Sequence, residues 1–185
     1  MKAISPGLRD ARVADHDRER QSKDTIDVRC PVSESTGNSS WLKAKMDVFQ
    51  AKCRAAGLKI TPQRMTVYQQ LVESKQHPSA DMLYRKVRKI LPSISLDTVN
   101  RTLLTLARIG MAFVVEGSGD VKRFDANLEN HQHFKCIKCK RIIDFYHKPF
   151  DNIPVPRPIS RKFTVLKKTV YFEGICDLCA GKPPS

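Results

Sequence analysis

The chain has 185 residues, of which 33 are Lys or Arg and 19 are Asp or Glu, so its net charge at pH 7 is +14. This length allows one or two small domains, and the charge favours an anionic partner such as nucleic acid. We find no secretory signal and no apolar stretch of membrane-spanning length, so we expect a cytoplasmic protein without a membrane segment.

The basic excess is unevenly distributed. Residues 1–40 carry seven basic and seven acidic residues, whereas residues 41–126 have a net charge of +8 and residues 127–185 a net charge of +6. The first 40 residues also contain few large apolar side chains and end in a stretch rich in Ser, Gly and Asn. Such a composition cannot bury enough surface to offset the entropy of ordering, so we predict a disordered N-terminal extension over 1–40.

Three helices are predicted next. Apolar residues recur at helical spacing over 41–56. Thr61 is placed to cap a second helix whose first residue is Pro62, a position that tolerates proline. Ser79 is placed to cap a third helix, which we expect to continue to Pro92.

A fourth helix is expected from Ser95, its N-cap, to Gly110. Its first turns are expected to expose side chains that can hydrogen-bond the edges of bases, namely Asp97, Thr98, Asn100, Arg101 and Thr102. Two strand-like runs follow, Met111 to Glu116 and Val121 to Asp125, joined by a Gly-Ser-Gly-Asp turn. Helices followed by a hairpin form a winged helix-turn-helix pattern, with 95–109 in the major groove. The alternative is an ordinary helical domain with a solvated basic face.

Four cysteines are arranged as two Cys-x-x-Cys pairs, Cys136 with Cys139 and Cys176 with Cys179. Two such pairs typically form a four-cysteine site for structural zinc. The alternatives are redox dithiols or disulfides, and disulfides are disfavoured in the cytoplasm. The 36 residues between the pairs require a small subdomain.

A second metal site is predicted from His131 and His133, which share one face of an extended strand. Asp125 precedes them, and Asp144 lies inside an apolar run where an unpaired carboxylate is costly. Nitrogen and oxygen ligands without sulfur favour iron, manganese or zinc.

These motifs resemble the ferric-uptake-regulator (Fur) family of bacterial metal-dependent repressors, and are most similar to its peroxide-sensing branch. The resemblance covers roughly residues 43–180. It rests on seven segments: Gly57 to Arg64, His77 to Asp81, Ser95 to Leu103, Arg123 to Asp125, His131 to Cys139, Ile143 to Phe145, and Gly174 to Cys179.

The resemblance implies an α+β protein. A winged helix-turn-helix DNA-binding domain would occupy 41–126, and a small α/β dimerisation domain with the four-cysteine zinc site would occupy 127–185. It also implies a homodimer on double-stranded DNA, at an A/T-rich pseudopalindromic operator.

At the hinge between the domains, the resemblance implies a regulatory Fe(II) or Mn(II) site, and it adds His77 to the four residues already considered. Peroxide would oxidise His77 or His133. The implied regulatory ligands are His77, Asp125, His131, His133 and Asp144, and the implied DNA contacts are Arg64, Ser95, Thr98, Asn100 and Arg101.

The chain departs from the family pattern in three places. Asn100 replaces a Tyr of the recognition helix, which changes the expected base preference. Lys168 and Gln132 replace a His and an acidic residue of a further metal site, so we do not expect that site. Prolines at 154, 156 and 158 interrupt the segment of a dimer-domain helix, so we expect a short helix or a loop there.

Other functions fit parts of the pattern. An iron- or manganese-responsive repressor without peroxide sensing is similar in every motif, and a zinc-uptake regulator fits less well because no further Cys lies near the hinge. A metal-dependent nuclease could use the same His and Asp residues, although five protein ligands leave little room for a reactive water. A constitutive DNA-binding zinc protein is the remaining alternative, and we expect no enzyme activity.

Overall fold

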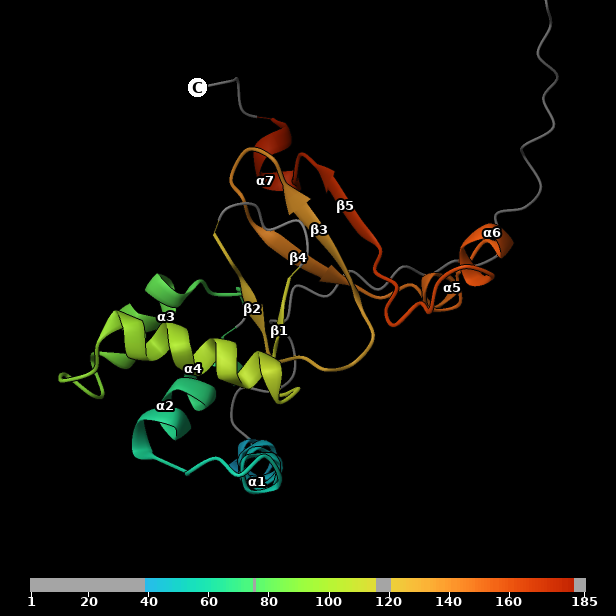
Figure 1. The fold of residues 1–185 in the computed structure, drawn as a ribbon. Helices are drawn as coiled ribbons and strands as arrows, with labels where there is room; N and C mark the ends of the chain where they lie inside the picture. Colours follow the sequence, from blue (N-terminus) through green and yellow to red (C-terminus); the bar gives the residue numbers. More distant parts are fainter. Residues whose placement is uncertain (1–38, 75, 116–120, 182–185) are drawn as a thin grey trace, which may run out of the picture.

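The computed structural model describes residues 39–74, 76–115 and 121–181 (Figure 1). The predicted N-terminal extension therefore lies outside the described residues up to position 38, as does the turn between the two wing strands.

Four helices make up the N-terminal part of the described chain. They are α1 (Ser39–Ala55), α2 (Pro62–Val72), α3 (Ala80–Val87) and α4 (Leu96–Arg108). The first begins two residues before the predicted start. The predicted caps are confirmed, because the hydroxyls of Thr61, Ser79 and Ser95 each accept a backbone N–H three residues later, at 3.3, 3.2 and 3.1 Å.

The third helix is shorter than predicted. The α-helix ends at Val87, and Lys89 and Ile90 donate to carbonyls only three residues back, at 3.2 and 2.9 Å. This tighter turn precedes Pro92, whose ring disfavours helical backbone at the residue before it. Ile90 lies in this tighter turn and is 54% exposed.

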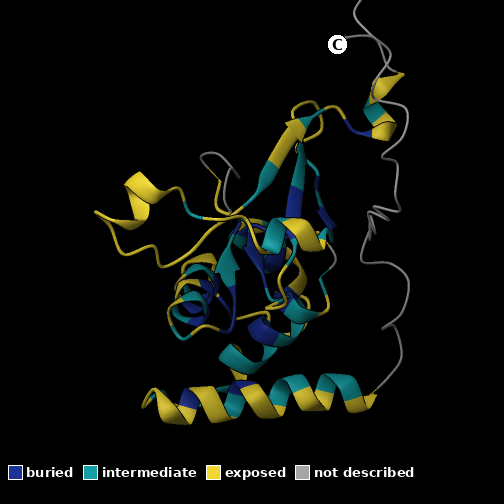
Figure 2. Cartoon of the chain, turned by 90° about the vertical axis from the view of Figure 1, so that its right-hand side faces the viewer, coloured by how far each residue is buried: buried dark blue, intermediate teal, exposed yellow. Residues whose placement is uncertain are grey.

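The hydrophobic core lies among these helices, where Figure 2 shows dark-blue buried segments. Phe49 of α1 stacks on Tyr68 of α2 with ring centroids 4.7 Å apart. Helix α4 contributes the fully buried Val99 and Leu103, and Thr102 is buried as well at 7% exposure, so the expectation that it is exposed was wrong. Burial of this face fixes α4 on the domain and leaves its opposite face available to solvent.

The wing is a two-stranded antiparallel ribbon of β1 (Phe113–Val114) and β2 (Phe124–Asp125). Both strands are shorter than the predicted runs. Phe113 pairs with Asp125 and Val114 with Phe124, and the side chain of Phe124 enters the helical core. This packing joins the wing firmly to the helices.

The C-terminal part contains a three-stranded sheet in the order β4-β3-β5. Its strands are β3 (Gln132–Cys136), β4 (Ile142–Phe145) and β5 (Tyr171–Gly174). Strand β3 pairs antiparallel with β4 and parallel with β5. The mixed helices and sheets confirm the predicted α+β class.

Three one-turn helices accompany this sheet: α5 (Lys148–Asp151), α6 (Arg157–Ser160) and α7 (Asp177–Ala180). The proline-containing segment is thus divided into two short helices and an extended stretch, as its composition predicts. Figures 1 and 2 show this segment standing out from the body of the molecule. In the part of the chain that the structure describes, no helix is long and apolar enough to cross a membrane.

Candidate metal centre

Five side chains converge on one point between the wing and the C-terminal sheet. They are His77, Asp125, His131, His133 and Asp144, and one ligand atom from each lies within 4.8 Å of all the others. Asp125 Oδ2 is 2.9 Å from His131 Nε2 and 3.2 Å from His77 Nε2. The structure therefore brings together all five residues of the predicted regulatory set.

These residues come from four separate elements. His77 lies in the connection between α2 and α3, and Asp125 ends β2. His131 immediately precedes β3, and His133 is its second residue. His133 is directly opposite Asp144 in the β3–β4 ladder, and directly paired residues project on the same face of a sheet. The site thus ties the helical and wing elements to the C-terminal sheet.

Hydrogen bonds orient two of the ligands. Asp125 Oδ1 accepts the backbone N–H of Asn127 at 2.7 Å, which leaves Oδ2 facing the histidines. His131 Nδ1 lies 2.7 Å from the carbonyl of Glu129, so Nδ1 carries the proton that it donates. Nε2 of the neutral ring is then the free acceptor, the form that binds a metal ion.

The spacing of the donor atoms fits an ion. Bonds of about 2.1 Å place neighbouring ligands of an octahedral ion about 3 Å apart. His131 Nε2 is 3.1 Å from His133 Nε2, and His77 Nε2 is 2.8 Å from Asp144 Oδ1. Two imidazole nitrogens at this distance can share only one proton in a hydrogen bond. A cation bound between them would instead accept a lone pair from each nitrogen.

Protons hold the site together when no metal is bound. Burial lowers the pKa of His77, but hydrogen bonds to Asp125 and Asp144 outweigh it and raise that pKa from 6.5 to about 9. Burial raises the pKa of Asp125, but hydrogen bonds from His131, His133 and His77 hold it well below its ordinary value. Without a metal, His77 is therefore an imidazolium that faces the ionised carboxylate of Asp125.

Metal binding should release protons. The raised His77 pKa means that this ring is protonated below about pH 9 without metal and must lose its proton to become a ligand. Affinity for Mn(II) should therefore rise with pH between 6.5 and about 9, by about tenfold per pH unit for each proton released. Titration calorimetry in buffers of different ionisation enthalpy measures the release, which should be smaller in His77→Ala. An affinity that does not change over this range contradicts the protonated site.

The second cluster consists of Cys136, Cys139, Cys176 and Cys179. Tetrahedral Zn–S bonds of about 2.3 Å place sulfurs about 3.8 Å apart, and Cys139 Sγ is 3.7 Å from Cys176 Sγ. The Cys176 backbone N–H donates to Cys136 Sγ at 3.4 Å, and that hydrogen bond is the main cause that lowers the pKa of Cys136 to about 6. The cluster presents four sulfur atoms in the arrangement that zinc requires.

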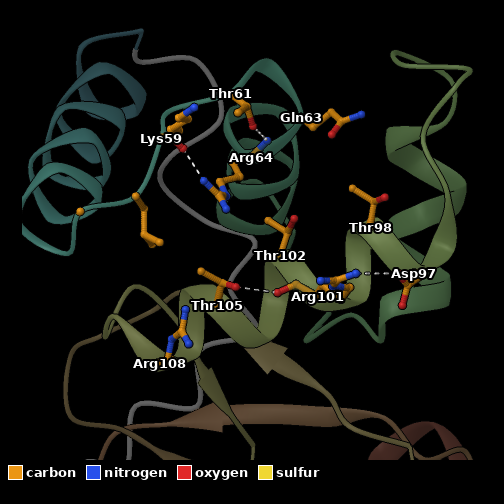
Figure 3. Close-up of a pocket in the computed structure, with 12 residues that line it drawn as sticks. Lys59, Thr61, Gln63, Arg64, Asp97, Thr98, Arg101, Thr102, Thr105 and Arg108 are labelled. Carbon is orange, nitrogen blue, oxygen red and sulfur yellow. Dashed lines mark hydrogen bonds and ion pairs between the residues drawn. The ribbon is translucent and has the colours of Figure 1, made fainter.

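The predicted DNA contacts lie on α2 and α4. Arg64, Thr98 and Arg101 line a groove of about 620 Å³ between the start of α2 and the exposed face of α4 (Figure 3). Lys59 and Arg108 line the same groove, so its lining has four basic side chains and one acidic residue, Asp97. Such a groove attracts a phosphate backbone.

The other two predicted DNA contacts are placed differently. Asn100 lines a second groove, of about 600 Å³, on the other side of α4 next to Lys122 of the wing. Ser95 is engaged in capping, since its hydroxyl accepts the Thr98 N–H and lies 2.9 Å from Thr98 Oγ1. The two grooves flank α4 on either side.

Gln132 and Lys168, which replace ligands of the family's further metal site, make other hydrogen bonds here. The buried Gln132 side chain donates to Asp151 Oδ1 at 3.0 Å and accepts the His147 backbone N–H at 2.9 Å, and Lys168 donates to the Ile153 carbonyl. Within the described ranges only the two clusters above could hold an ion.

Sequence reasoning assigned no role to the residues that surround the centre. The ring centroids of Phe113 and Tyr146 lie 5.7 and 5.9 Å from that of His131. Arg123 hydrogen-bonds the carbonyl of His77. Only Arg123 had a sequence signal, since it begins the segment from Arg123 to Asp125 on which the family resemblance partly rests.

A winged helix-turn-helix joined to a small sheet through a cluster of His and Asp residues defines a metal-responsive DNA-binding regulator. The chain belongs to the ferric uptake regulator family, whose model matches residues 55–173.

Relatives and solved structures agree with this assignment. A peroxide-responsive repressor PerR of Staphylococcus epidermidis is 33% identical over 129 residues, which cover 70% of this chain and 86% of that protein. A PerR of Staphylococcus aureus (strain Mu50) is 32% identical over a match that covers 71% of this chain and 89% of that protein. The structure resembles the Fur protein of Helicobacter pylori with a TM-score of 0.64 at 22% identity, covering 77% of this chain and 96% of that one. It also resembles the Fur protein of Vibrio cholerae, with a TM-score of 0.55 at 26% identity over 69% of this chain and 98% of that one.

Proposed function

We propose that this chain is a metal-dependent transcriptional repressor that responds to hydrogen peroxide. It would hold structural zinc at the four cysteines and Fe(II) or Mn(II) at His77, Asp125, His131, His133 and Asp144. The observation that carries the proposal is the origin of these ligands, since two come from the helical and wing elements and three from the C-terminal sheet.

The geometry supports control of DNA binding by the metal. A bound divalent cation would neutralise the charge of the two carboxylates and accept a lone pair from each of the three imidazoles. Asp125 would then fix the wing, and His77 the start of α3, at a set position relative to the sheet. In a dimer this position determines the separation of the two α4 helices, and hence their fit to two successive half-sites.

Support for peroxide sensing comes from the PerR relatives and from the donor set. Fe(II), when held by these residues, would supply the redox chemistry that splits hydrogen peroxide. In the overall reaction one ring carbon of His77 or His133 exchanges its C–H for a C–O bond, and the peroxide is reduced to water. The oxygenated ring is a poorer ligand, so the tie between the elements weakens. The same nitrogen and oxygen donors also suit a repressor that senses iron or manganese alone.

DNA binding is supported by the basic groove beside α4. Lys59, Arg64 and Arg108 can neutralise phosphates, which makes affinity strongly dependent on salt. Arg101 lines this groove, whereas the half-buried Asn100 lines the groove on the other side of α4, and Asn pairs favourably with adenine. We infer an A/T-rich pseudopalindromic operator, read by a dimer.

A second copy of the chain is the partner that the C-terminal surface fits. Phe163, Leu166 and Phe172 are 63%, 92% and 44% exposed. Apolar side chains in such number usually mark a protein interface. We infer a homodimer formed through this part of the chain, and a boundary between its two domains near residue 126.

Nuclease activity is not proposed. Five protein atoms converge on the regulatory position, so an octahedral ion would keep one position for peroxide, and the described residues of the site supply no further carboxylates for the second ion of a two-metal nuclease. Since curated relatives carry the name of repressors, we infer that the chain is a regulator and not an enzyme.

The deciding experiment measures DNA binding by the zinc-loaded protein. An operator is first selected from random duplex DNA with Mn(II) present. Affinity for it is then measured with Mn(II), with Fe(II), and after chelation, and a low dose of hydrogen peroxide is added to each metal form. We expect tight binding only with metal, and loss after peroxide only in the Fe(II) form. Peptides that contain His77 or His133 should gain one oxygen atom in that form alone.

Each other result has a definite meaning. Metal-dependent binding without oxidation of either histidine identifies an iron or manganese sensor. Binding that chelation does not change contradicts a regulatory role for the site, and metal-dependent DNA cleavage contradicts the assignment as a repressor.

A further inference from the structure

Arg123 reaches from the wing to the connection that carries His77. Its Nε–H donates to the His77 carbonyl, and Nη2 donates to the Gln76 carbonyl at 3.0 Å. The side chain is half-buried, and it bridges 46 residues of sequence. Its two acceptors are therefore the carbonyls of adjacent residues, and one of these residues, His77, belongs to the metal centre.

The backbone at His77 requires such support. His77 has a φ of +45°, a left-handed conformation that residues with a side chain rarely adopt. Such conformations persist where the surroundings determine them. Along the described chain, Lys140 is the one other residue besides glycine with a positive φ.

The neighbouring residue of the wing adds a third hydrogen bond. The Phe124 N–H donates to the Pro78 carbonyl at 3.0 Å. Three successive carbonyls, those of residues 76 to 78, are thus bound by Arg123 and Phe124. Next along β2, Asp125 meets His77 Nε2 at 3.2 Å. The wing consequently holds His77 both by its backbone and by its ring.

We propose that Arg123 is a positioning residue of the regulatory metal site, which holds His77 at the place where it can share an ion with the sheet. The proposal rests on the proposed function of this site. A guanidinium is suited to the task because its fixed fork of donors matches two adjacent carbonyls, whereas the ammonium of Lys is a single point charge. Because Arg123 binds carbonyls, its hydrogen bonds serve to orient the backbone.

The test measures Co(II) and Mn(II) affinity of the zinc-loaded protein by competition with a chelator. Arg123→Met keeps much of the length of the side chain and removes its donors. We expect it to weaken binding by about 10- to 100-fold, the usual effect of losing a group that orients a ligand. Lys122→Met is the matched control. It removes the same charge from the adjacent, exposed residue, and its affinity should stay within about twofold of wild type.

A double-mutant cycle separates positioning from general structural support. A residue that acts only through His77 loses its effect when that ligand is absent. In a His77→Ala background, Arg123→Met should therefore cause no further loss of affinity. The Co(II) absorption spectrum of Arg123→Met should also shift towards that of His77→Ala, since both lack the same nitrogen ligand.

Three outcomes overturn the proposal: wild-type affinity in Arg123→Met, an equal loss in Lys122→Met, or the full loss repeated in the His77→Ala background. Should Arg123→Met fail to fold, Arg123→Lys provides the same comparisons with a smaller expected loss. Failure of the proposed function is distinct, because the wild-type protein would then bind neither metal at this site.

Discussion

Cys136→Ser is expected to remove zinc from the protein and to disorder the end of the C-terminal sheet. Cys136 ends β3, and its three partners lie in the following turn and at α7. Helix α7 has a single turn and no buried residue of its own, so few contacts besides the metal hold it. Binding of structural zinc contributes about 10–16 kcal/mol in small zinc domains, which far exceeds what these contacts supply.

Metal analysis and thermal unfolding measure this effect. Zinc should fall from one ion per chain to a small fraction, and DNA binding should be lost because the dimerising part is no longer ordered. Cys53→Ala is the control, because it removes a buried thiol from the helical core without touching the cluster. It should retain zinc. Full zinc retention in Cys136→Ser contradicts a site of four cysteines.

Asp125→Asn is expected to weaken regulatory metal binding by more than about 100-fold, since the loss of a group that merely orients a ligand already costs about 10- to 100-fold. Asp125 Oδ2 lies 2.9, 3.2 and 3.6 Å from the Nε2 atoms of the three histidines. The amide keeps the shape and the acceptor for Asn127, but removes the charge that favours a divalent cation.

The loss should appear in both metal and DNA affinity. The chelator competition used for Co(II) and Mn(II) gives the first, and binding to the selected operator at fixed Mn(II) gives the second. Asp81→Asn removes a carboxylate paired with Arg85 on the surface of α3 and should leave metal affinity unchanged. DNA binding by Asp125→Asn that stays metal-dependent at wild-type Mn(II) concentrations rejects Asp125 as a ligand.

The sequence predicted the parts of this structure that short-range patterns control. Each helix cap could be found because its acceptor and donor lie three residues apart. The cysteine pairs could be found because two loops of one spacing converge on one ion. The predicted end of α3 was wrong by several residues, because apolar spacing does not reveal a turn that tightens before proline.

Long-range placement could not be predicted from the residues alone. His77 lies 48 residues from Asp125, and only the family resemblance joined it to the site. Arg123 acts on backbone carbonyls, which leave no trace in a pattern of side chains. The rings of Phe113 and Tyr146 reach the centre because of strand pairing and loop paths, neither of which has a sequence motif of its own.

Arg123 and the two residues of strand β2, Phe124 and Asp125, follow one another in the chain, and this arrangement has a thermodynamic consequence. The same short segment belongs to the DNA-reading wing and to the regulatory site. Whatever factor the metal adds to the affinity for DNA, DNA must add to the affinity for the metal. On the proposed function, protein bound to an operator would retain its ion at metal concentrations that empty the free protein, so the promoters that it occupies would respond to falling metal only after the free protein has lost its ion.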